Sequence, residues 1–256
     1  MPNLLCAHVP YPMLVTNLDQ VLAKRLNPEV FLPGEVLDSL IPEELQSVAE
    51  ALAAEGLRCT IHAPFMDLNP GSVEPLIREA TLRRFQQVLD AAAILKPAVV
   101  VMHPGYDHWR YGEQQDQWLR HAIATFGQVL ARAEEIGCTV AVENIFEEEP
   151  ATLKALLEAV DHPRFRHCFD VGHWNLFGTV SLEEWFTELG GYIAEVHVHD
   201  NYGRRDDHAP IGEGNIDFGH YFSLLRQYAP DAVYTIEAHC REALERALTA
   251  LDPYLR

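Results

Sequence analysis

Apolar and polar positions along the chain fall into two patterns: short runs of aliphatic and β-branched residues, and longer amphipathic stretches with helical spacing. The two kinds of segment follow one another along the whole length, which is typical of a parallel sheet covered by crossover helices. For example, Leu76, Ala80, Phe85, Leu89 and Ala92 share one face of a helix. The pattern therefore predicts an α/β protein.

Eight apolar runs are predicted to be strands, and the second is short and ends in Pro33-Gly34. These runs are Leu4 to Val9, Val30 to Leu32, Leu57 to His62, Ala98 to His103, Thr139 to Glu143, Arg166 to Asp170, Ile193 to His199 and Ala232 to Glu237. Helices are predicted between and after them, at Leu18 to Leu26, Pro42 to Glu55, Val73 to Leu95, Gln114 to Ile136, Ala151 to Val160, Leu182 to Leu189, Phe218 to Tyr228 and Arg241 to Leu251.

This number of strand–helix pairs in a chain of 256 residues matches the size of a (β/α)8 barrel, the TIM barrel. No linker, repeat or low-complexity segment divides the sequence, so we expect one domain over residues 1–256. An open doubly wound sheet is the alternative fold. However, no glycine-rich nucleotide fingerprint follows the first strand.

Composition narrows the class of protein. With 48% hydrophobic and 22% charged residues, the chain has the balance of an ordinary globular protein. No apolar run reaches the ~20 residues that span a bilayer, and the N-terminus lacks the basic region of a secretory signal, so we expect a cytoplasmic protein. The net charge of −19 opposes binding to nucleic acid. The five cysteines show no Cys-x-x-Cys pair, and we expect buried, reduced thiols.

Residues that suit metal ions follow the predicted strands. In a barrel, the carboxyl ends of the strands surround one mouth, so residues that end successive strands become neighbours. Imidazole and carboxylate groups are the ligands preferred by zinc, manganese and iron. The groups at this end of strands three to eight are His62, His103, Glu143, Asp170, His173, His197, Asp206, His208 and Glu237.

Each of these residues has an ordinary structural explanation when taken alone. A histidine can be hydrogen-bonded inside the barrel, and Glu143 or Glu237 can pair with a lysine or arginine. Six consecutive strands that all present such a group are not explained in this way, because a buried cluster of carboxylates is costly without cations. The sequence therefore predicts a metal site.

Other candidates are left with two interpretations each. His8 ends the first strand and either orients substrate or is a core histidine. The aromatic segment 105–112, which contains Trp109, is either a lid over a ligand or a packed surface loop. Arg204 and Arg205 either hold a phosphate or carboxylate of the substrate or form a solvated pair.

Several motifs carry a family resemblance: His62-Ala-Pro-Phe, His103-Pro-Gly, Val142-Glu-Asn, Phe169-Asp-Val-Gly-His173, His197-Val-His-Asp-Asn, and Asp206-Asp-His208 with Ile211-Gly-Glu-Gly214. In this order, over essentially the whole chain, they resemble the xylose isomerase-like TIM barrel superfamily. Each motif is weak alone, but the ordered set is specific. That superfamily includes sugar and sugar-phosphate isomerases and epimerases, and endonuclease IV-type apurinic-site endonucleases.

The resemblance implies two nested metal arrangements. In the epimerases, one divalent ion, often manganese, is held by residues that match Glu143, Asp170, His197 and Glu237. In the endonucleases, three zinc ions use residues that match all nine positions. The sets are His62, His103 and Glu143 for the first, the same four epimerase residues for the second, and His173, Asp206 and His208 for the third. This chain keeps all nine residues, so we expect one to three ions, manganese or zinc.

The expected function is a metal-dependent sugar or sugar-phosphate isomerase or epimerase. Proton abstraction would proceed through a metal-stabilised enediolate, with Glu143 and Glu237 as the acid/base pair. His173 and His199 would bind substrate hydroxyls or tune the ligands. The alternative is a multi-zinc phosphoesterase of the endonuclease IV type, against which the net charge and the absence of a basic residue in the segment 33–38 argue. A further alternative is a barrel that binds sugar or metal without catalysis. The sequence leaves a homo-oligomer open.

Overall fold

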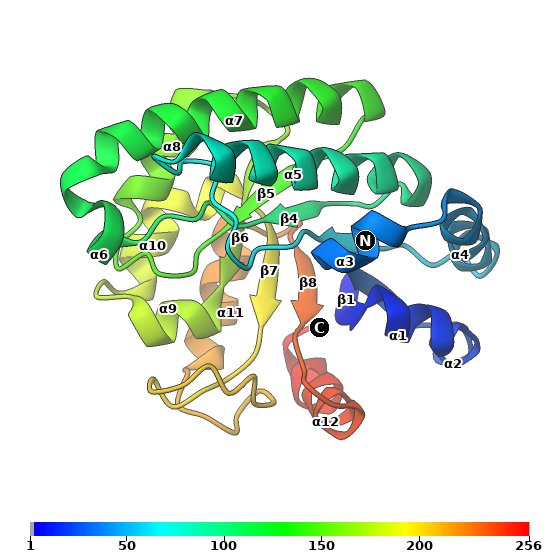
Figure 1. Cartoon of the computed structure of the whole chain (residues 1–256). Helices are drawn as coiled ribbons and strands as arrows, with labels where there is room; N and C mark the ends of the chain where they lie inside the picture. Colours follow the sequence, from blue (N-terminus) through cyan, green and yellow to red (C-terminus); the bar gives the residue numbers. More distant parts are fainter. Residues whose placement is uncertain (1–2, 256) are drawn as a thin grey trace.

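Eight parallel strands close into one barrel, in which the last strand pairs with the first (Figure 1). The computed structural model describes residues 3–255. The strands are β1 (Leu5–Pro10), β2 (Asn27–Phe31), β3 (Thr60–His62), β4 (Val100–Met102), β5 (Val140–Glu143), β6 (Phe165–Asp170), β7 (Ile193–Val198) and β8 (Val233–Ile236). The expected (β/α)8 barrel is confirmed, and the open sheet is wrong.

The helices surround the strands, and the long ones lie where the hydrophobic pattern predicts them (Figure 1). Four match the expected bounds, namely α8 (Ala151–Val160), α10 (Leu182–Leu189), α11 (Phe218–Tyr228) and α12 (Arg241–Leu251). Four more differ by at most 3 residues at an end: α2 (Leu18–Ala23), α4 (Pro42–Ala54), α5 (Pro75–Leu95) and α7 (Gln115–Ile136). Four short helices were not expected: α1 (Tyr11–Thr16), α3 (Gly34–Ser39), α6 (His108–Tyr111) and α9 (Val171–Phe177).

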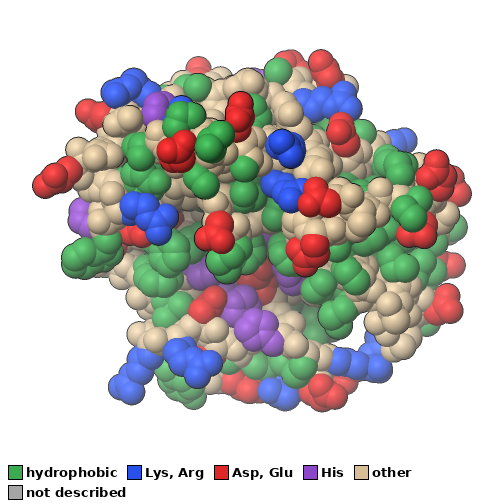
Figure 2. Space-filling view, in the orientation of Figure 1, with side chains coloured by type: hydrophobic (Ala, Val, Ile, Leu, Met, Phe, Trp, Pro, Cys, Tyr) green, Lys and Arg blue, Asp and Glu red, His purple; other side chains and the backbone are tan. Residues whose placement is uncertain are grey.

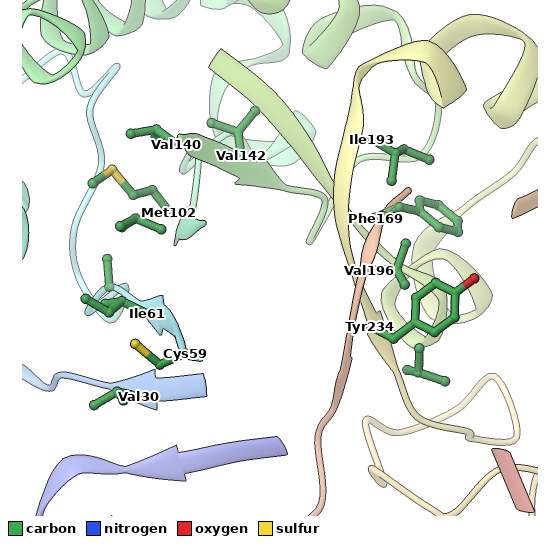
Figure 3. Close-up of a cluster of buried hydrophobic side chains, with 14 of the residues drawn as sticks. Val30, Cys59, Ile61, Met102, Val140, Val142, Phe169, Ile193, Val196 and Tyr234 are labelled. Atoms are coloured by element: carbon green, nitrogen blue, oxygen red, sulfur yellow. The ribbon is translucent and has the colours of Figure 1, made fainter. Parts of the chain in front are cut away.

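Alternation along the strands separates two packing layers. In β4, Val100 and Met102 belong to the large core between strands and helices, whereas Val101 belongs to a small cluster inside the barrel. Figure 3 shows side chains of the large core around the strands. Since successive strand residues point to opposite faces, Glu143 shares the inward face of β5 with Ala141. The same alternation turns the other strand-end carboxylates and imidazoles inward.

Strand β2 corrects one expectation. It runs from Asn27 to Phe31, whereas the sequence predicted Val30 to Leu32. Pro28 obscured the start, because a proline inside an apolar run argues against a strand. In the barrel, Pro28 pairs in register with Ala7 of β1 and the strand continues through it. The longer strand includes Glu29, whose side chain is fully buried.

Within residues 3–255, no helix combines the length and apolar character that crossing a membrane requires. All five cysteines are free thiols, and Cys6, Cys59, Cys138 and Cys168 are buried as expected. The expectation of burial is wrong for Cys240, which is exposed because it follows β8 and precedes α12.

Candidate functional site

The predicted ligands meet at one end of the barrel, where all of them except Asp170 and His197 line a cavity of about 770 Å³. Figure 2 shows histidine and acidic side chains at the bottom of this hollow. The walls are largely apolar and come from the loops after β3, β4 and β5 and from α9. They include Phe65, Met66, Tyr106, Phe146 and Phe177. The cavity therefore combines a polar, titratable floor with an apolar wall on one side, as many small-molecule sites do.

His197 lies at the centre of the four residues expected to share one ion. Its Nδ1 atom is 3.4 Å from Glu143 Oε2, 3.8 Å from Asp170 Oδ2 and 3.5 Å from Glu237 Oε1. Among the described residues, this buried nitrogen has no hydrogen-bond partner. A buried nitrogen aimed at three carboxylates without a hydrogen bond is the donor arrangement that a divalent cation fits. These residues thus suit a metal ion.

Two further histidines approach the same oxygen of Glu143 as His197 does. His62 Nε2 is 3.2 Å and His103 Nε2 is 3.3 Å from Glu143 Oε2. The other ring nitrogen of His62, Nδ1, lies 2.8 Å from the carbonyl oxygen of Ala63, which leaves Nε2 directed toward the carboxylate. Phe65 stacks on the ring of His103 at 4.5 Å. The backbone contact of His62 and the stacking on His103 fix the two rings against Glu143, as expected for the first predicted ligand set.

The third predicted set is also assembled. Asp206 Oδ2 lies 3.4 Å from His173 Nε2 and 2.9 Å from His208 Nε2. Asp206 and His208 belong to the long loop after β7, whereas His173 lies on α9. The structure thus brings all nine predicted ligands to one place, although they span residues 62–237.

The charges of the cluster compensate one another. Burial raises the pKa of Glu143, but the imidazoles of His197 and His103 outweigh it and hold that pKa well below its usual range. Burial lowers the pKa of His62, but the hydrogen bond to Glu143 and its charge raise it to about 9. Because a metal ligand must be an unprotonated imidazole, cation binding at this cluster would release protons.

The remaining predicted residues lie in two environments. His199 is buried, with Nε2 3.1 Å from Asp170 Oδ2, and His8 Nδ1 lies 2.7 Å from Glu29 Oε2. In contrast, Trp109 is 91% exposed. Arg204 and Arg205 line a separate surface hollow, and the structure brings none of these last three to the cavity wall.

Three residues of the site were not predicted from the sequence. Glu29 contacts both His8 and His197. His239, which follows Glu237 by two positions, stacks on His208 at 4.3 Å. Arg110, beside Trp109, lines the cavity. His239 could have been predicted, because the inward alternation of β8 extends through Glu237 to this residue. Glu29 could not, because Pro28 kept the start of β2 from being predicted as a strand.

Two proteins of known sequence illustrate the range of similar chains. An uncharacterized protein of Methanocaldococcus jannaschii is 30% identical over 205 residues, which cover 77% of this chain and 70% of the relative. A probable endonuclease 4 of Mycobacterium leprae is 28% identical over 185 residues, covering 68% of this chain and 70% of the relative.

Solved structures agree with the fold over nearly the full length. A D-tagatose 3-epimerase-like protein superimposes with a TM-score of 0.84 at 25% identity, covering 100% of this chain and 97% of the other. The TTHB071 protein of Thermus thermophilus, soaked with ZnCl2, gives 0.82 at 26% identity, covering 98% and 97%. The family model described as xylose isomerase-like TIM barrel matches residues 29–254. The chain therefore belongs to the xylose isomerase-like TIM barrel family.

Proposed function

We propose that the protein is a divalent-metal-dependent isomerase or epimerase of a sugar or sugar-phosphate. One observation carries this proposal: Glu143 and Glu237 line the same cavity and both flank His197 Nδ1, at 3.4 and 3.5 Å. Two carboxylates beside one ligand cluster can act on opposite sides of a bound carbon atom, as proton removal and return require.

Glu143, Asp170, His197 and Glu237 would hold the principal ion, zinc or manganese. The set of His62, His103 and Glu143 and the set of His173, Asp206 and His208 could each hold one further ion. A divalent cation supplies charge stabilisation for an oxygen that becomes negative during proton abstraction. The carboxylate of Glu143 lines the cavity, so this side chain can accept a proton from the carbon next to a carbonyl group of a bound substrate. Glu237 would deliver a proton from the other side.

The cavity supports a small substrate rather than a nucleic-acid duplex. Its volume of about 770 Å³ suits an organic molecule, and its wall is largely apolar. The net charge of −19 opposes a polyanion. The single arginine among the lining residues, Arg110, would suit one phosphate or carboxylate group, and we assign it the role first expected of Arg204 and Arg205. The similarity to the epimerase-like structure is also in line with this assignment.

Activity on a panel of ketoses and ketose phosphates tests the proposal. The substitution Glu143→Gln should abolish proton exchange at the substrate carbon, measured by deuterium incorporation from D2O, while circular dichroism stays unchanged. Glu113→Gln, in the exposed segment before α7, is a matched control and should keep full activity. An active Glu143→Gln enzyme would overturn the assignment.

A second candidate is a multi-zinc phosphoesterase of the endonuclease IV type. It is favoured by the assembled contacts of Asp206 with His173 and His208, and by the relative in Mycobacterium leprae. Metal analysis and cleavage of an oligonucleotide with an abasic site separate the two candidates. About three zinc ions per chain, together with cleavage, would replace the isomerase proposal. Proton exchange on a sugar, without cleavage of the oligonucleotide, would support the isomerase proposal.

A further inference from the structure

Glu29 is a fully buried carboxylate at the level of the barrel just below the ligand cluster. Its two oxygens have separate partners on two other strands. Oε1 lies 3.0 Å from His197 Nε2, and Oε2 lies 2.7 Å from His8 Nδ1. A carboxylate is only an acceptor when ionised, so each imidazole donates its N–H to Glu29.

These contacts determine which nitrogen of His197 faces the cluster. With Nε2–H directed at Glu29, Nδ1 is left with its lone pair, and this is the atom that lies 3.5 Å from Glu237. A carboxylate on the far nitrogen of a ligating histidine fixes its tautomer and ring orientation and raises its basicity. Glu29 has this position relative to His197.

We propose that Glu29 is a positioning residue that orients His197 for the metal ion and, through its second oxygen, ties His8 to the same site. The proposal rests on the metal site of the proposed function, but not on the reaction or the substrate. It adds a carboxylate from β2 to a site whose predicted ligands all come from later strands.

The neighbouring buried carboxylate Glu195 has a different partner. The side chain of Glu195 accepts a hydrogen bond from Thr235 Oγ1 at 2.5 Å. Of these two carboxylates, it is therefore Glu29 that is placed to orient His197.

Cobalt titration of the metal-free protein tests the role of Glu29. The substitution Glu29→Gln replaces one acceptor oxygen with an amide N–H, which then faces a histidine N–H. We expect a Co²⁺ dissociation constant about 10- to 100-fold higher than that of the wild type. Glu195→Gln is the matched control, because it also alters a buried barrel carboxylate, and it should keep the wild-type constant. Equal constants for Glu29→Gln and the wild type would overturn the proposal.

A second measurement needs no folded variant of Glu29. In the Zn²⁺-loaded wild type, long-range ¹H–¹⁵N spectra should show that His197 carries its proton on Nε2, with a far-downfield shift from the carboxylate contact. A proton on Nδ1 would contradict the proposal, and so would a wild-type protein that binds no Co²⁺. If the protein binds metal with the expected affinities and with the His197 proton on Nε2, but turns over no sugar, the role of Glu29 holds and the proposed reaction is wrong.

Discussion

Asp200 organises the loop that carries Asp206 and His208. Its carboxylate accepts hydrogen bonds from the backbone N–H groups of Asn201 at 2.9 Å, Gly212 at 3.0 Å and Gly214 at 2.8 Å. Charge-assisted bonds of this kind are stronger than neutral ones. A single side chain thus fixes the loop geometry on which the third ligand set depends.

Gly214 is a position of this loop at which no side chain fits. A Cβ atom there would lie 2.2 Å from Asp200 Oδ1, so Gly214→Ala must displace the carboxylate from its donors. We expect a loss of roughly 1–3 kcal/mol in the free energy of unfolding, measured with urea, because buried N–H groups lose their acceptor. Hydrogen exchange should rise in residues 200–216. Gly191→Ala, where nothing lies within 4 Å, is the control and should change neither quantity.

At the residue scale, the sequence was sufficient to bring the nine candidate ligands to one end of the barrel, because each lies at or beyond the end of a predicted strand. Alternation along the strand accounts for the inward direction of those that end a strand, but not for His173, Asp206 and His208. It was not sufficient for Glu29, whose only local context is Asn27-Pro28, a pair that predicts a turn rather than a strand. Nor did the sequence indicate that Arg110, rather than Arg204 or Arg205, lines the cavity. Which arginine reaches the cavity depends on the path of long loops, which no periodic pattern encodes.

At the scale of elements, the long helices were predicted closely, and of the short ones α1, α3, α6 and α9 were missed. Helix α5, with 21 residues, repeats its apolar positions often enough to identify a face, whereas the 4 residues of α6 cannot. Strands β3 and β4 are shorter than predicted because the apolar runs extend beyond the paired residues. The hydrophobic pattern thus predicted where each element lies, and the hydrogen-bond pairing with neighbouring strands determines where each strand ends.

The packing of β6 against α10 depends on a neutral histidine. His167 Nδ1 lies 2.9 Å from the carbonyl oxygen of Val142, and Trp185 Nε1 donates to His167 Nε2 at 3.3 Å. A proton on Nε2 would face the indole N–H. Burial accordingly lowers the pKa of His167 to about 4.

This histidine should weaken the fold in acid. The unfolded chain binds a proton below pH ~6.5, whereas the folded chain does so only near pH 4. Stability from this group is therefore complete at neutral pH and falls by about 1.4 kcal/mol per unit between these values. Urea unfolding of the wild type and of His167→Gln at pH 7 and pH 5 measures this loss of stability. The variant should lose less stability on acidification, and an equal loss would contradict this explanation.

For the whole molecule, a bound cation should be a main determinant of stability, because carboxylates from several strands converge on one cluster. An ion that binds only the folded chain adds about 2.7 kcal/mol at a concentration 100 times its dissociation constant. Since ~1 kcal/mol shifts the Tm by ~2–4 °C in a chain of this size, Mn²⁺ or Zn²⁺ should raise the Tm by roughly 5–10 °C over EDTA-treated protein. Glu143→Gln should show a smaller shift, and an unchanged wild-type Tm would count against the metal site.

The distribution of thiols has a practical consequence. Cys240 is exposed and follows the end of β8, whereas the other four cysteines are buried. A maleimide dye should therefore label the folded protein at this one position, three residues beyond Glu237, which lines the cavity. The protein thus provides a natural attachment point for a fluorescent reporter, with which the capture of any small molecule in the cavity can be followed in real time, whether or not it is turned over.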